Sequence, residues 1–478
     1  METLDQLIKQ RVTKLESVRK AGSDPYQTVF KRDGSLQELL AGFKEGEILN
    51  VAGRLTALRG QGKIAFGDLK DQTGKIQLFF SEEILKEKYP LVAATLDLGD
   101  ILGAVGSAFV TRTGEKTIRI SDWKLLSKAL RPLPEKWHGL QNQELRYRKR
   151  YLDLLSNPET REHFQLRSRL VTGIRRFLDG RGFLEVETPM MQPIPGGAAG
   201  KPFKTHHNAL GLDLFLRIAP ELYLKKLLVG GFERVYELNR NFRNEGLSTR
   251  HNPEFTMLEV YEAYGDCATM MELTEELIFT LAEGLLGKTN LVYGNRNIFL
   301  KRPWKRVSFE QLVYDKCGIK PTDSIEIMVR KLKVDFPVIP KNQWAKVILS
   351  SLDEMFEHAG DVPIFVTDFF KVFSPLAKSL PDRPHIADRF ELFIGGIEVA
   401  NAYSEQNDPL EQRRSLQASQ ELGGELAQPV DEDFLEALEY GMPPAAGLGI
   451  GIDRLVMLLT GAHNIREVLL FPTMRPKL

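Results

Sequence analysis

The chain has little cysteine and no excess of either charge. Its 478 residues include only two cysteines, Cys267 and Cys317, which cannot form a disulfide framework or a zinc site built on cysteine. The 64 basic side chains balance the 64 acidic ones, so the overall charge does not indicate nucleic-acid binding. Any contact with a nucleic acid must therefore depend on local basic patches.

Long apolar runs are also absent. No stretch of about 18 apolar residues occurs, so we expect no membrane-spanning helix. Apolar residues from Leu4 to Val18 follow helical spacing, but charged residues interrupt them, which excludes the apolar region of a signal peptide. Two cysteines fit a reducing compartment, and we expect a cytoplasmic protein. The length favours two or three domains.

The first part of the chain has the pattern of a small β domain. Turn residues separate five short apolar segments, at 48–58, 63–70, 75–80, 101–110 and 116–126. Closing five strands into a barrel removes exposed strand edges. An oligonucleotide-binding (OB) barrel is the favoured interpretation, and a barrel or sandwich without a ligand remains the alternative.

The rest of the chain mixes helical and strand-like segments, so the fold class is α+β. The predicted boundaries are an N-terminal helical segment (1–48), the barrel (49–130), a linker (131–160) and the mixed domain (161–478). The linker contains the basic run RYRKR at 146–150. Such a run is usually a solvated helix face, and contact with phosphates is the alternative.

One long arginine-containing segment carries the strongest chemical signal. It runs from 239 to 246 (NRNFRNEG) and continues from 249 to 255 (TRHNPEF). Arg243 presents a planar fork of donors suited to phosphate or carboxylate. Glu245 can accept from an exocyclic amine, His251 can donate to a phosphate, and Phe255 offers an aromatic face to a base. Each residue alone is more often structural, so the signal lies in their joint spacing.

Two further segments accompany it. In Gly447–Arg454 (GLGIGIDR), glycines allow close approach of the backbone to a ligand, and Arg454 would open a helix that faces it. The spacing differs from the dinucleotide-binding pattern, and no P-loop lysine follows. Glycines that pack a helix on a strand are the alternative. The weaker segment 181–189 (RGFLEVETP) alternates like a strand that ends at Pro189.

Together these segments resemble motifs 1, 2 and 3 of the class II aminoacyl-tRNA synthetases. Others resemble the lysyl-tRNA synthetases of bacterial type, so that the resemblance covers nearly the whole chain: 130–134 (LRPLP), 138–141 (HGLQ), 148–154 (RKRYLDL), 195–198 (PGGA), 219–225 (APELYLK) and 471–472 (FP). The resemblance implies a five-stranded OB-fold barrel that binds the anticodon. It also implies a catalytic domain with an antiparallel sheet flanked by helices, and a homodimer with Pro189 at the partner side.

The resemblance implies a two-step reaction. The lysine carboxylate attacks the α-phosphate of ATP to give lysyl-adenylate and pyrophosphate, and a terminal ribose hydroxyl of tRNA(Lys) then attacks the acyl carbon. The carboxylate is already an anion, so the first step needs alignment and cations rather than a general base. The implied catalytic residues are Arg243 and Arg454. The implied ATP-binding residues are Arg243, Glu245, His251, Asn252, Phe255, Glu391 and Arg454.

The resemblance also implies a metal ion and a lysine pocket. Glu391 and Glu398 would hold Mg2+ between the phosphates, and solvent-facing strand acids are the alternative. Glu221 would bind the α-ammonium group, and Glu405 would pair with the ε-ammonium group and repel aspartate. The implied lysine-binding residues are Gly197, Glu221, Arg243, Tyr261, Asn401, Tyr403 and Glu405.

In the barrel, the resemblance implies anticodon contacts at Arg59, Phe66, Gln77 and Glu115. Phe66 would stack on a base and Gln77 would read a base edge, whereas a phenylalanine in the barrel core is the alternative.

The chain departs from the family pattern at Phe369, Phe370, Ala400, Ala402 and Gln406, which bears on strand geometry and pocket volume. Two other functions are the alternatives. A paralogue that attaches a lysine-like group to a translation factor would lack the barrel. A regulatory RNA-binding paralogue would have lost Arg243, Arg454 or the paired glutamates. The absence of a long lysine-rich helix before the barrel favours the bacterial type.

Overall fold

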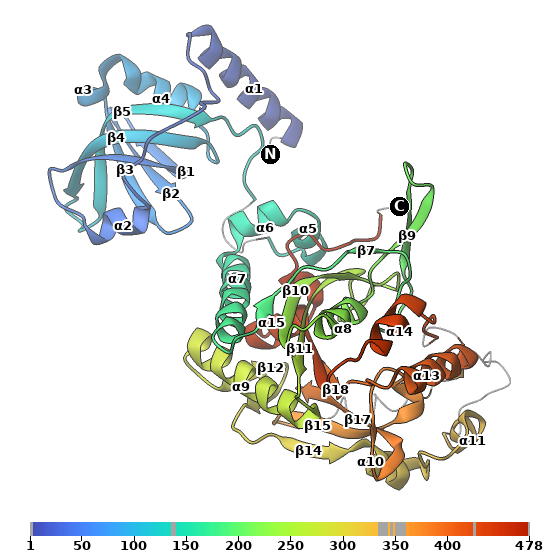
Figure 1. Ribbon diagram of the computed structural model, residues 1–478. Helices are drawn as coiled ribbons and strands as arrows, with labels where there is room; N and C mark the ends of the chain where they lie inside the picture. Colours follow the sequence, from blue (N-terminus) through green and yellow to red (C-terminus); the bar gives the residue numbers. More distant parts are fainter. Residues whose placement is uncertain are drawn as a thin grey trace. The chain divides into compact units, whose positions relative to one another are not determined.

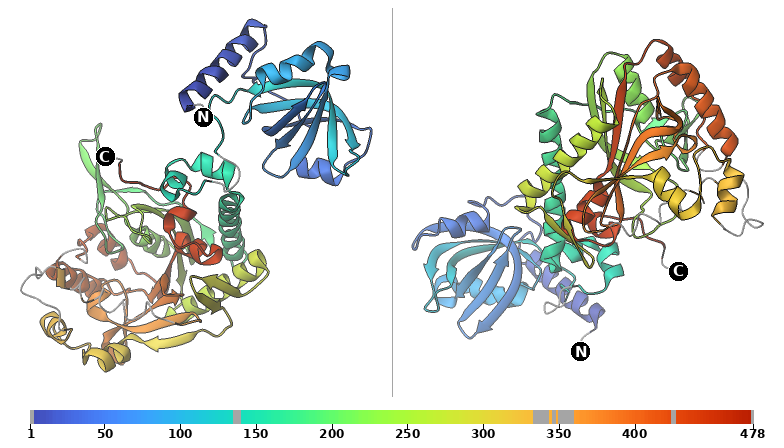
Figure 2. Two further views of the ribbon diagram at one scale, coloured as in Figure 1. Left: turned by 180° about the vertical axis from the view of Figure 1, so that it is seen from behind. Right: turned by 90° about the horizontal axis from the view of Figure 1, so that it is seen from below.

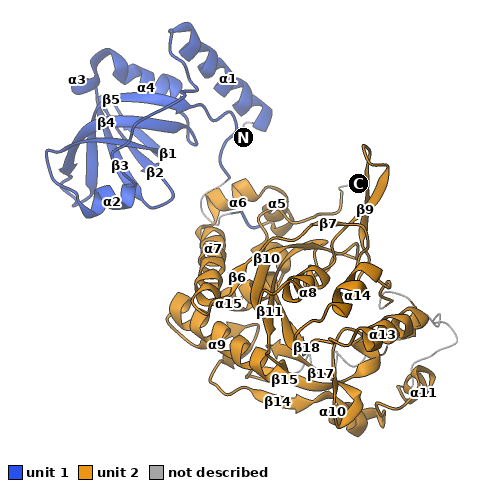
Figure 3. Ribbon diagram, in the orientation of Figure 1, with its two compact units in different colours: residues 1–141 blue, residues 142–478 orange. Residues whose placement is uncertain are grey.

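The chain folds into two compact units, residues 1–141 and 142–478, which are described separately (Figure 3). The computed structural model describes residues 3–134, 140–332, 343–344, 348, 360–423 and 427–476. His138 and Gly139 of the expected 138–141 segment lie outside the described residues.

The first unit is a closed five-stranded barrel with the strand order β1-β2-β3-β5-β4, as the sequence predicted. Its strands are β1 (Ile48–Gln61), β2 (Ile64–Lys70), β3 (Lys75–Ser81), β4 (Ile101–Val110) and β5 (Lys116–Ser127). Apolar side chains at alternate positions, such as Val51, Leu69, Leu78 and Ile118, fill the interior. Every second residue faces outward, because successive side chains of a strand point to opposite faces.

Short helices accompany the barrel. They are α1 (Leu4–Lys20), α2 (Leu36–Ala41), α3 (Glu82–Leu85), the 3-10 turn η1 (Lys86–Lys88) and α4 (Tyr89–Thr95). The helix α1 begins at Thr3, whose side chain and backbone exchange hydrogen bonds with Gln6 as a capping box.

A nine-stranded sheet organises the second unit (Figures 1 and 2). The order is β14-β15-β17-β18-β19-β11-β10-β6, and β16 pairs with β17. The bounds are β6 (Leu184–Glu185), β10 (Arg234–Phe242), β11 (Glu254–Ala263), β14 (Lys305–Ser308), β15 (Ile364–Phe370), β16 (Ser379–Leu380), β17 (Arg383–Ile394), β18 (Ile397–Ser404) and β19 (Ala445–Gly451). Most neighbours are antiparallel, and β6–β10 and β14–β15 are parallel.

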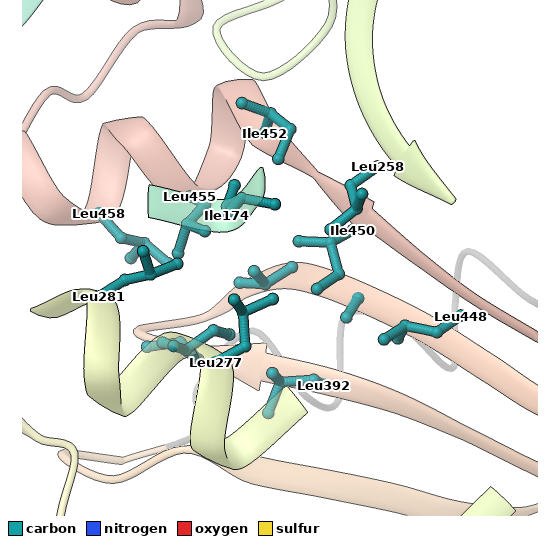
Figure 4. Packing of buried hydrophobic residues seen from close by; sticks show 14 of the residues in the cluster. Ile174, Leu258, Leu277, Leu281, Leu392, Leu448, Ile450, Ile452, Leu455 and Leu458 are labelled. Atoms are coloured by element: carbon teal, nitrogen blue, oxygen red, sulfur yellow. The ribbon is translucent and has the colours of Figure 1, made fainter. Parts of the chain in front are cut away.

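Helices α7 (Pro158–Asp179), α9 (Cys267–Leu286) and α15 (Ile452–Thr460) cover one face of this sheet. Their side chains pack with those of the central strands into the largest core, where Ile174, Leu277 and Leu455 meet Leu258 and Ile450 (Figure 4). This layer is closed, so alternate residues of the same strands are left to face the opposite side.

The opposite side is only partly covered. Helix α8 (Glu221–Val229) packs against β10, β11 and α14 (Glu432–Glu439), and α13 (Pro409–Leu422) lies beside α14. The remaining elements are α10 (Phe309–Cys317), α11 (Ile325–Lys331), η4 (Lys371–Phe373), α16 (Ile465–Val468), the β12–β13 hairpin (Asn290–Tyr293, Arg296–Phe299) and the small sheet β7-β9-β8 (Met191–Gln192, Leu212–Leu216, Phe203–His207).

Two segments differ from what the sequence suggested. The strand expected over 182–189 is only the two residues of β6, because Gly182 has φ +77° and Pro189 offers no backbone donor. Residues 142–160, expected in a linker, form α5 (Gln143–Arg148), α6 (Arg150–Ser156) and the first residues of α7 in the second unit. Within the basic run, Arg150 is buried beside Asp153 and donates to the backbone carbonyls of Leu469 and Leu470.

The unusual positions of the family pattern are mostly core positions. Phe369 and Phe370 are buried, and Phe369 stacks on Phe309 with ring centroids 4.7 Å apart. Ala400 and Ala402 belong to the closed core layer, and Ala400 also borders the open side of the sheet. None of the helices in the described part of the chain has the length and hydropathy to cross a membrane.

Candidate active site and nucleic-acid interface

A cavity of about 340 Å³ opens on the uncovered side of the large sheet. Residues of β11, β17, β18 and β19 line it, together with loops beside the sheet. The predicted residues that line it are Gly197, Glu221, Arg243, Glu245, His251, Asn252, Phe255, Tyr261, Glu391, Glu398, Asn401, Tyr403 and Arg454. Residues separated by up to 257 positions in the chain, from 197 to 454, thus converge on one cavity.

Two arginines form the basic end of the cavity. The guanidinium carbon of Arg243 lies 5.2 Å from the centre of the Phe255 ring, and Nε of Arg243 is buried without a hydrogen-bond partner. Arg454 donates to the backbone carbonyl and a carboxylate oxygen of Glu398 at 2.8 and 2.9 Å. Its Nη2 lies 3.2 Å from Nε2 of His251. Burial and the positive charge of Arg454 lower the pKa of His251, so its ring is neutral at pH 7.

Two carboxylates line the same cavity from neighbouring strands. Glu391 on β17 pairs with Arg389, and Glu398 on β18 pairs with Arg454. Burial opposes ionisation of Glu398, but the charges of Arg454 and Arg243 outweigh it and hold the pKa below its usual value. Within the described residues, no group of three or more acidic, histidine or cysteine side chains is arranged to hold a metal ion by itself. Two ionised carboxylates fit a magnesium ion that takes its other ligands from phosphates and water.

A cluster of buried charges forms the other end. Oε1 of Glu221 accepts hydrogen bonds from Lys225 Nζ and from Tyr403 Oη, both at 2.6 Å. Nζ of Lys225 also lies 2.5 Å from Oε2 of Glu405, although the angles are not those of a hydrogen bond. Glu405 is 1% exposed and is not among the residues that line the cavity. The structure therefore places the Glu405 carboxylate behind the cavity wall, with Lys225 as its charge partner.

Beside Glu221, a second acid lines this end of the cavity: Glu259, which the sequence reasoning missed. It lies on β11 and lines the cavity between the predicted residues Phe255 and Tyr261. Burial, reinforced by the negative charge of Glu221 and opposed by Arg243, raises the pKa of Glu259 to about 8. Alternation along β11 could have revealed it, because residues 255, 259 and 261 share one face of a strand.

The glycines of β19 make room for these acids. A side chain at Gly447 would meet Glu405 Oε1 at 2.2 Å and the Tyr261 ring at 2.5 Å. A side chain at Gly449 would meet the Glu259 carboxylate at 3.4 Å. The sequence suggested that the glycines of this motif approach a ligand or pack a helix on a strand. In the structure, Gly447 and Gly449 leave space for side chains of neighbouring strands.

Two other predicted residues, Gly197 and Asn252, shape or hold the backbone around the cavity. Gly197 has φ +84°, and a side chain there would lie 3.0 Å from Cβ of Glu221. Asn252 donates to the carbonyl of Glu254 at 2.7 Å and accepts from the amide of Thr473 at 3.3 Å. Its amide therefore joins motif 2 to the C-terminal segment.

On the barrel, Phe66 faces outward and is half-buried, so it is not a core phenylalanine. Its ring contacts that of Phe79 at 5.1 Å, and Phe79 contacts Phe109 at 5.9 Å. The guanidinium of Arg119 lies 4.6 Å from the Phe109 ring. The sequence reasoning missed these last three residues, although all lie at outward positions of predicted strands.

The other predicted residues of the barrel lie on or near these strands. In the strand register, Phe66 is opposite Arg59 on β1, and Asp68 of β2 is opposite Gln77 on β3. Glu115 is exposed in the β4–β5 turn. Aromatic rings beside arginines on an open barrel face form a surface suited to stacking with nucleic-acid bases.

The antiparallel sheet, the arginines at its basic end and the preceding barrel define a class II aminoacyl-tRNA synthetase. Residues 142–475 match the family described as tRNA synthetases class II (D, K and N), and residues 49–126 match the OB-fold nucleic acid binding domain. The chain belongs to the lysine–tRNA ligases of that class. It is 50% identical to the lysine–tRNA ligase of Carboxydothermus hydrogenoformans, covering 100% of this chain and 99% of the relative.

Two further relatives support this assignment. The lysine–tRNA ligase of Pelotomaculum thermopropionicum is 50% identical over 100% of this chain and 96% of its own length. That of Citrobacter koseri is 48% identical over 99% of this chain and 97% of its own length. Because the chain matches lysine–tRNA ligases over its full length, including the barrel, these comparisons disfavour both alternatives, the translation-factor paralogue and the regulatory paralogue.

Proposed function

We propose that this enzyme activates L-lysine with ATP in the cavity of the second unit and transfers it to tRNA(Lys). The observation that carries the proposal is the polarity of the cavity, with the partly buried Arg243 and Arg454 at one end and the buried acid Glu259 at the other. A substrate with a carboxylate at one end and an ammonium group at the other matches this order. ATP–pyrophosphate exchange with lysine, compared with aspartate and asparagine, tests it.

Residues of β11 indicate how ATP and lysine are oriented in the cavity. Phe255, beside Arg243, marks the adenine and phosphate end, and Glu259 and Tyr261 mark the amino-acid end. Four residues of a strand span about 13 Å, which leaves room for an aminoacyl-adenylate between the two ends. In this arrangement Arg243 holds the α-phosphate and the lysine carboxylate. Phe255 and Arg454 enclose the adenine, and Glu245 accepts from its amino group.

Glu221 receives the α-ammonium group, helped by the backbone of Gly197. We place the ε-ammonium group at Glu259, beside Tyr261, which donates to the Glu259 carboxylate at 3.4 Å. Glu405 acts on the same ammonium group from behind the wall. Asn401 and Tyr403 close the sides of the pocket. A neutral or acidic amino-acid side chain would leave these buried carboxylates uncompensated, which opposes its binding.

ATP chemistry in this class needs cations that absorb charge on the phosphates. Glu391 and Glu398 would hold Mg2+, which polarises the phosphates when bound. Arg243 and Arg454 supply further positive charge from fixed positions, and His251 can donate to the distal phosphates. The carboxylate nucleophile needs only to be aligned, so no residue of the chain has to remove a proton in the first step.

We also propose that the enzyme works as a cytoplasmic homodimer. Leu184, Met190 and Met191 are exposed apolar residues of the motif 1 segment, next to Pro189. Leu184 lies on β6 at the end of the large sheet, and Met191 lies on β7 of the small sheet. An exposed apolar strip beside a sheet edge fits burial against a second copy of the chain.

The acidity of Glu259 predicts how lysine recognition depends on pH. Its pKa is raised to about 8, so below pH 8 the side chain is mostly neutral and must lose a proton before it can pair with an ammonium group. The KM for lysine in pyrophosphate exchange should therefore rise by up to about tenfold for each pH unit below 8. The KM for ATP serves as the internal control, and a flat lysine profile between pH 6.5 and 8.5 would contradict the role of Glu259.

The aromatic face of the barrel predicts that a change at Phe66 weakens tRNA binding without affecting lysine activation. Replacing Phe66 with alanine removes one stacking surface, worth about 1–3 kcal/mol per base. The KM for tRNA(Lys) in aminoacylation should rise accordingly, while lysine-dependent pyrophosphate exchange stays unchanged. Phe43→Ala provides the control, because this half-buried phenylalanine lies beneath Lys116 instead. Equal tRNA affinities of the two variants would exclude Phe66 from the interface.

A further inference from the structure

Lys225 is a fully buried cation between two acids of the lysine pocket. Its side chain is 0% exposed. Nζ lies 2.6 Å from Oε1 of Glu221, one turn earlier on α8, and 2.5 Å from Oε2 of Glu405, after β18. The rings of Tyr403 and Phe434 lie 5.6 and 5.7 Å away. It does not line the cavity.

This contact holds two elements in register. Glu221 begins α8, and Glu405 follows the strand that supplies Asn401 and Tyr403. Tyr403 also donates to Glu221, to the same oxygen that Lys225 contacts. The ammonium group of Lys225 therefore fixes the orientation of the carboxylate assigned to the α-ammonium group of the substrate.

The net charge at this end of the cavity also matches the substrate lysine. Three acids, Glu221, Glu259 and Glu405, surround this end of the cavity, and Lys225 is the cation in contact with two of them. When all are ionised, two negative charges remain uncompensated. Free lysine brings two ammonium groups to this end, and its carboxylate goes to Arg243.

Two other cations near this end, Arg217 and Lys371, make their contacts away from these three acids. Arg217 is buried against its own partner, Glu237, at 2.6 Å. Lys371 donates to the backbone carbonyls of Ser374, Pro375 and Ala377. Tyr261 and Tyr403 both have pKa values raised above the usual tyrosine value by burial and by these acids, so both are neutral.

We propose that Lys225 is a positioning residue that determines specificity for lysine. It orients Glu221 and Glu405 and sets the charge of the pocket to match the two ammonium groups of the substrate. This inference rests on the proposed orientation of lysine at Glu221 and Glu259. Burying a charge without a partner is costly, so a pocket with one charge too many or too few should bind lysine more weakly.

The first test compares two adjacent lysines. Lys225→Met removes the buried cation, whereas Lys226→Met removes a neighbouring lysine that pairs with the exposed Asp433. In pyrophosphate exchange, Lys225→Met should raise the KM for lysine by about 30-fold or more and leave the KM for ATP nearly unchanged. Lys226→Met should change neither. The KM for lysine in Lys225→Met should also depend more steeply on pH, because a further carboxyl must lose a proton before substrate binds.

The second test restores the charge count. Glu405→Gln alone leaves one negative charge too few, and Lys225→Met alone leaves one too many. The double variant Lys225→Met/Glu405→Gln has the original balance with two neutral side chains of similar size. It should therefore bind lysine more tightly than Glu405→Gln, even if Lys225→Met alone fails to fold. Thermal unfolding of all four variants identifies losses due to folding.

The outcomes are distinct. The role of Lys225 would be overturned if the double variant had a KM for lysine no lower than that of Glu405→Gln. It would also be overturned if the KM for lysine in Lys225→Met depended on pH no more steeply than in the unmodified enzyme. The same holds if Lys225→Met affects the KM values for lysine and ATP equally. Failure of the proposed lysine orientation would be recognised independently, by a Glu259→Gln variant with an unchanged KM for lysine.

Discussion

Replacing Glu259 with glutamine should nearly abolish lysine recognition while leaving ATP binding intact. Glu259 is a buried carboxylate that lines the acidic end of the cavity together with Glu221, and glutamine keeps its size but removes its charge. Loss of one partner of a buried charge pair costs about 2–5 kcal/mol, so the KM for lysine should rise by about 30-fold to several thousandfold. The measurement is lysine-dependent ATP–pyrophosphate exchange with separate titrations of lysine and ATP.

Two features make this result specific. Glu254→Gln is the matched control, because Glu254 begins the same strand but is exposed beside Arg240, and it should behave like the unmodified enzyme. The dependence of the lysine KM on pH near 8 should also disappear in Glu259→Gln, since the titrating group has been removed. An unchanged KM for lysine, or an equal rise in both variants, would remove Glu259 from the pocket.

Replacing Arg243 with lysine should lower kcat of the exchange reaction strongly although the positive charge is kept. Arg243 is held over Phe255 with Nε buried and unpartnered, so its planar fork is oriented before the substrates bind. Lysine has a single ammonium group and cannot bridge a phosphate and a carboxylate in this way. Loss of one preorganised donor at a developing charge costs about 2.7–4 kcal/mol, which corresponds to a fall of about 100-fold or more.

Arg240→Lys supplies the control for this change. Arg240 lies on β10 three residues before Arg243, and its side chain is 40% exposed beside Glu254. An exposed ion pair of this kind contributes little, so its kcat should stay close to that of the unmodified enzyme. If Arg243→Lys also retains normal kcat, then Arg243 contributes only charge, and the alignment of the substrates must come from other groups.

The barrel shows how far sequence pattern alone can reach. All five predicted strands match β1 to β5 closely, because alternating apolar residues and glycine-containing turns act locally. The helix α9 (Cys267–Leu286) is likewise rich in apolar residues, ten of its residues being buried. The strand expected over 182–189 is reduced to the two residues of β6, which begins just after the left-handed Gly182.

The cavity residues were predicted from spaced motifs and family resemblance. That resemblance placed Arg243, Phe255 and Arg454 in one site, and all three line one cavity. It could not reveal that Glu405 lies behind the wall, because this depends on where α8 delivers Lys225. Nor did it single out Glu259, whose importance comes from burial rather than from any motif letter.

The sequence by itself determined the two-domain α+β architecture, the arginine motifs and the class of enzyme. These depend on local periodicity and on residue spacing along the chain. Only the tertiary structure decided which acid faces the cavity and which one is neutralised. The positions of these acids depend on the register of β11, β18 and β19 and on how α8 packs nearby. The tertiary structure is decisive because the electrostatic energy of buried charges changes strongly over a few ångströms.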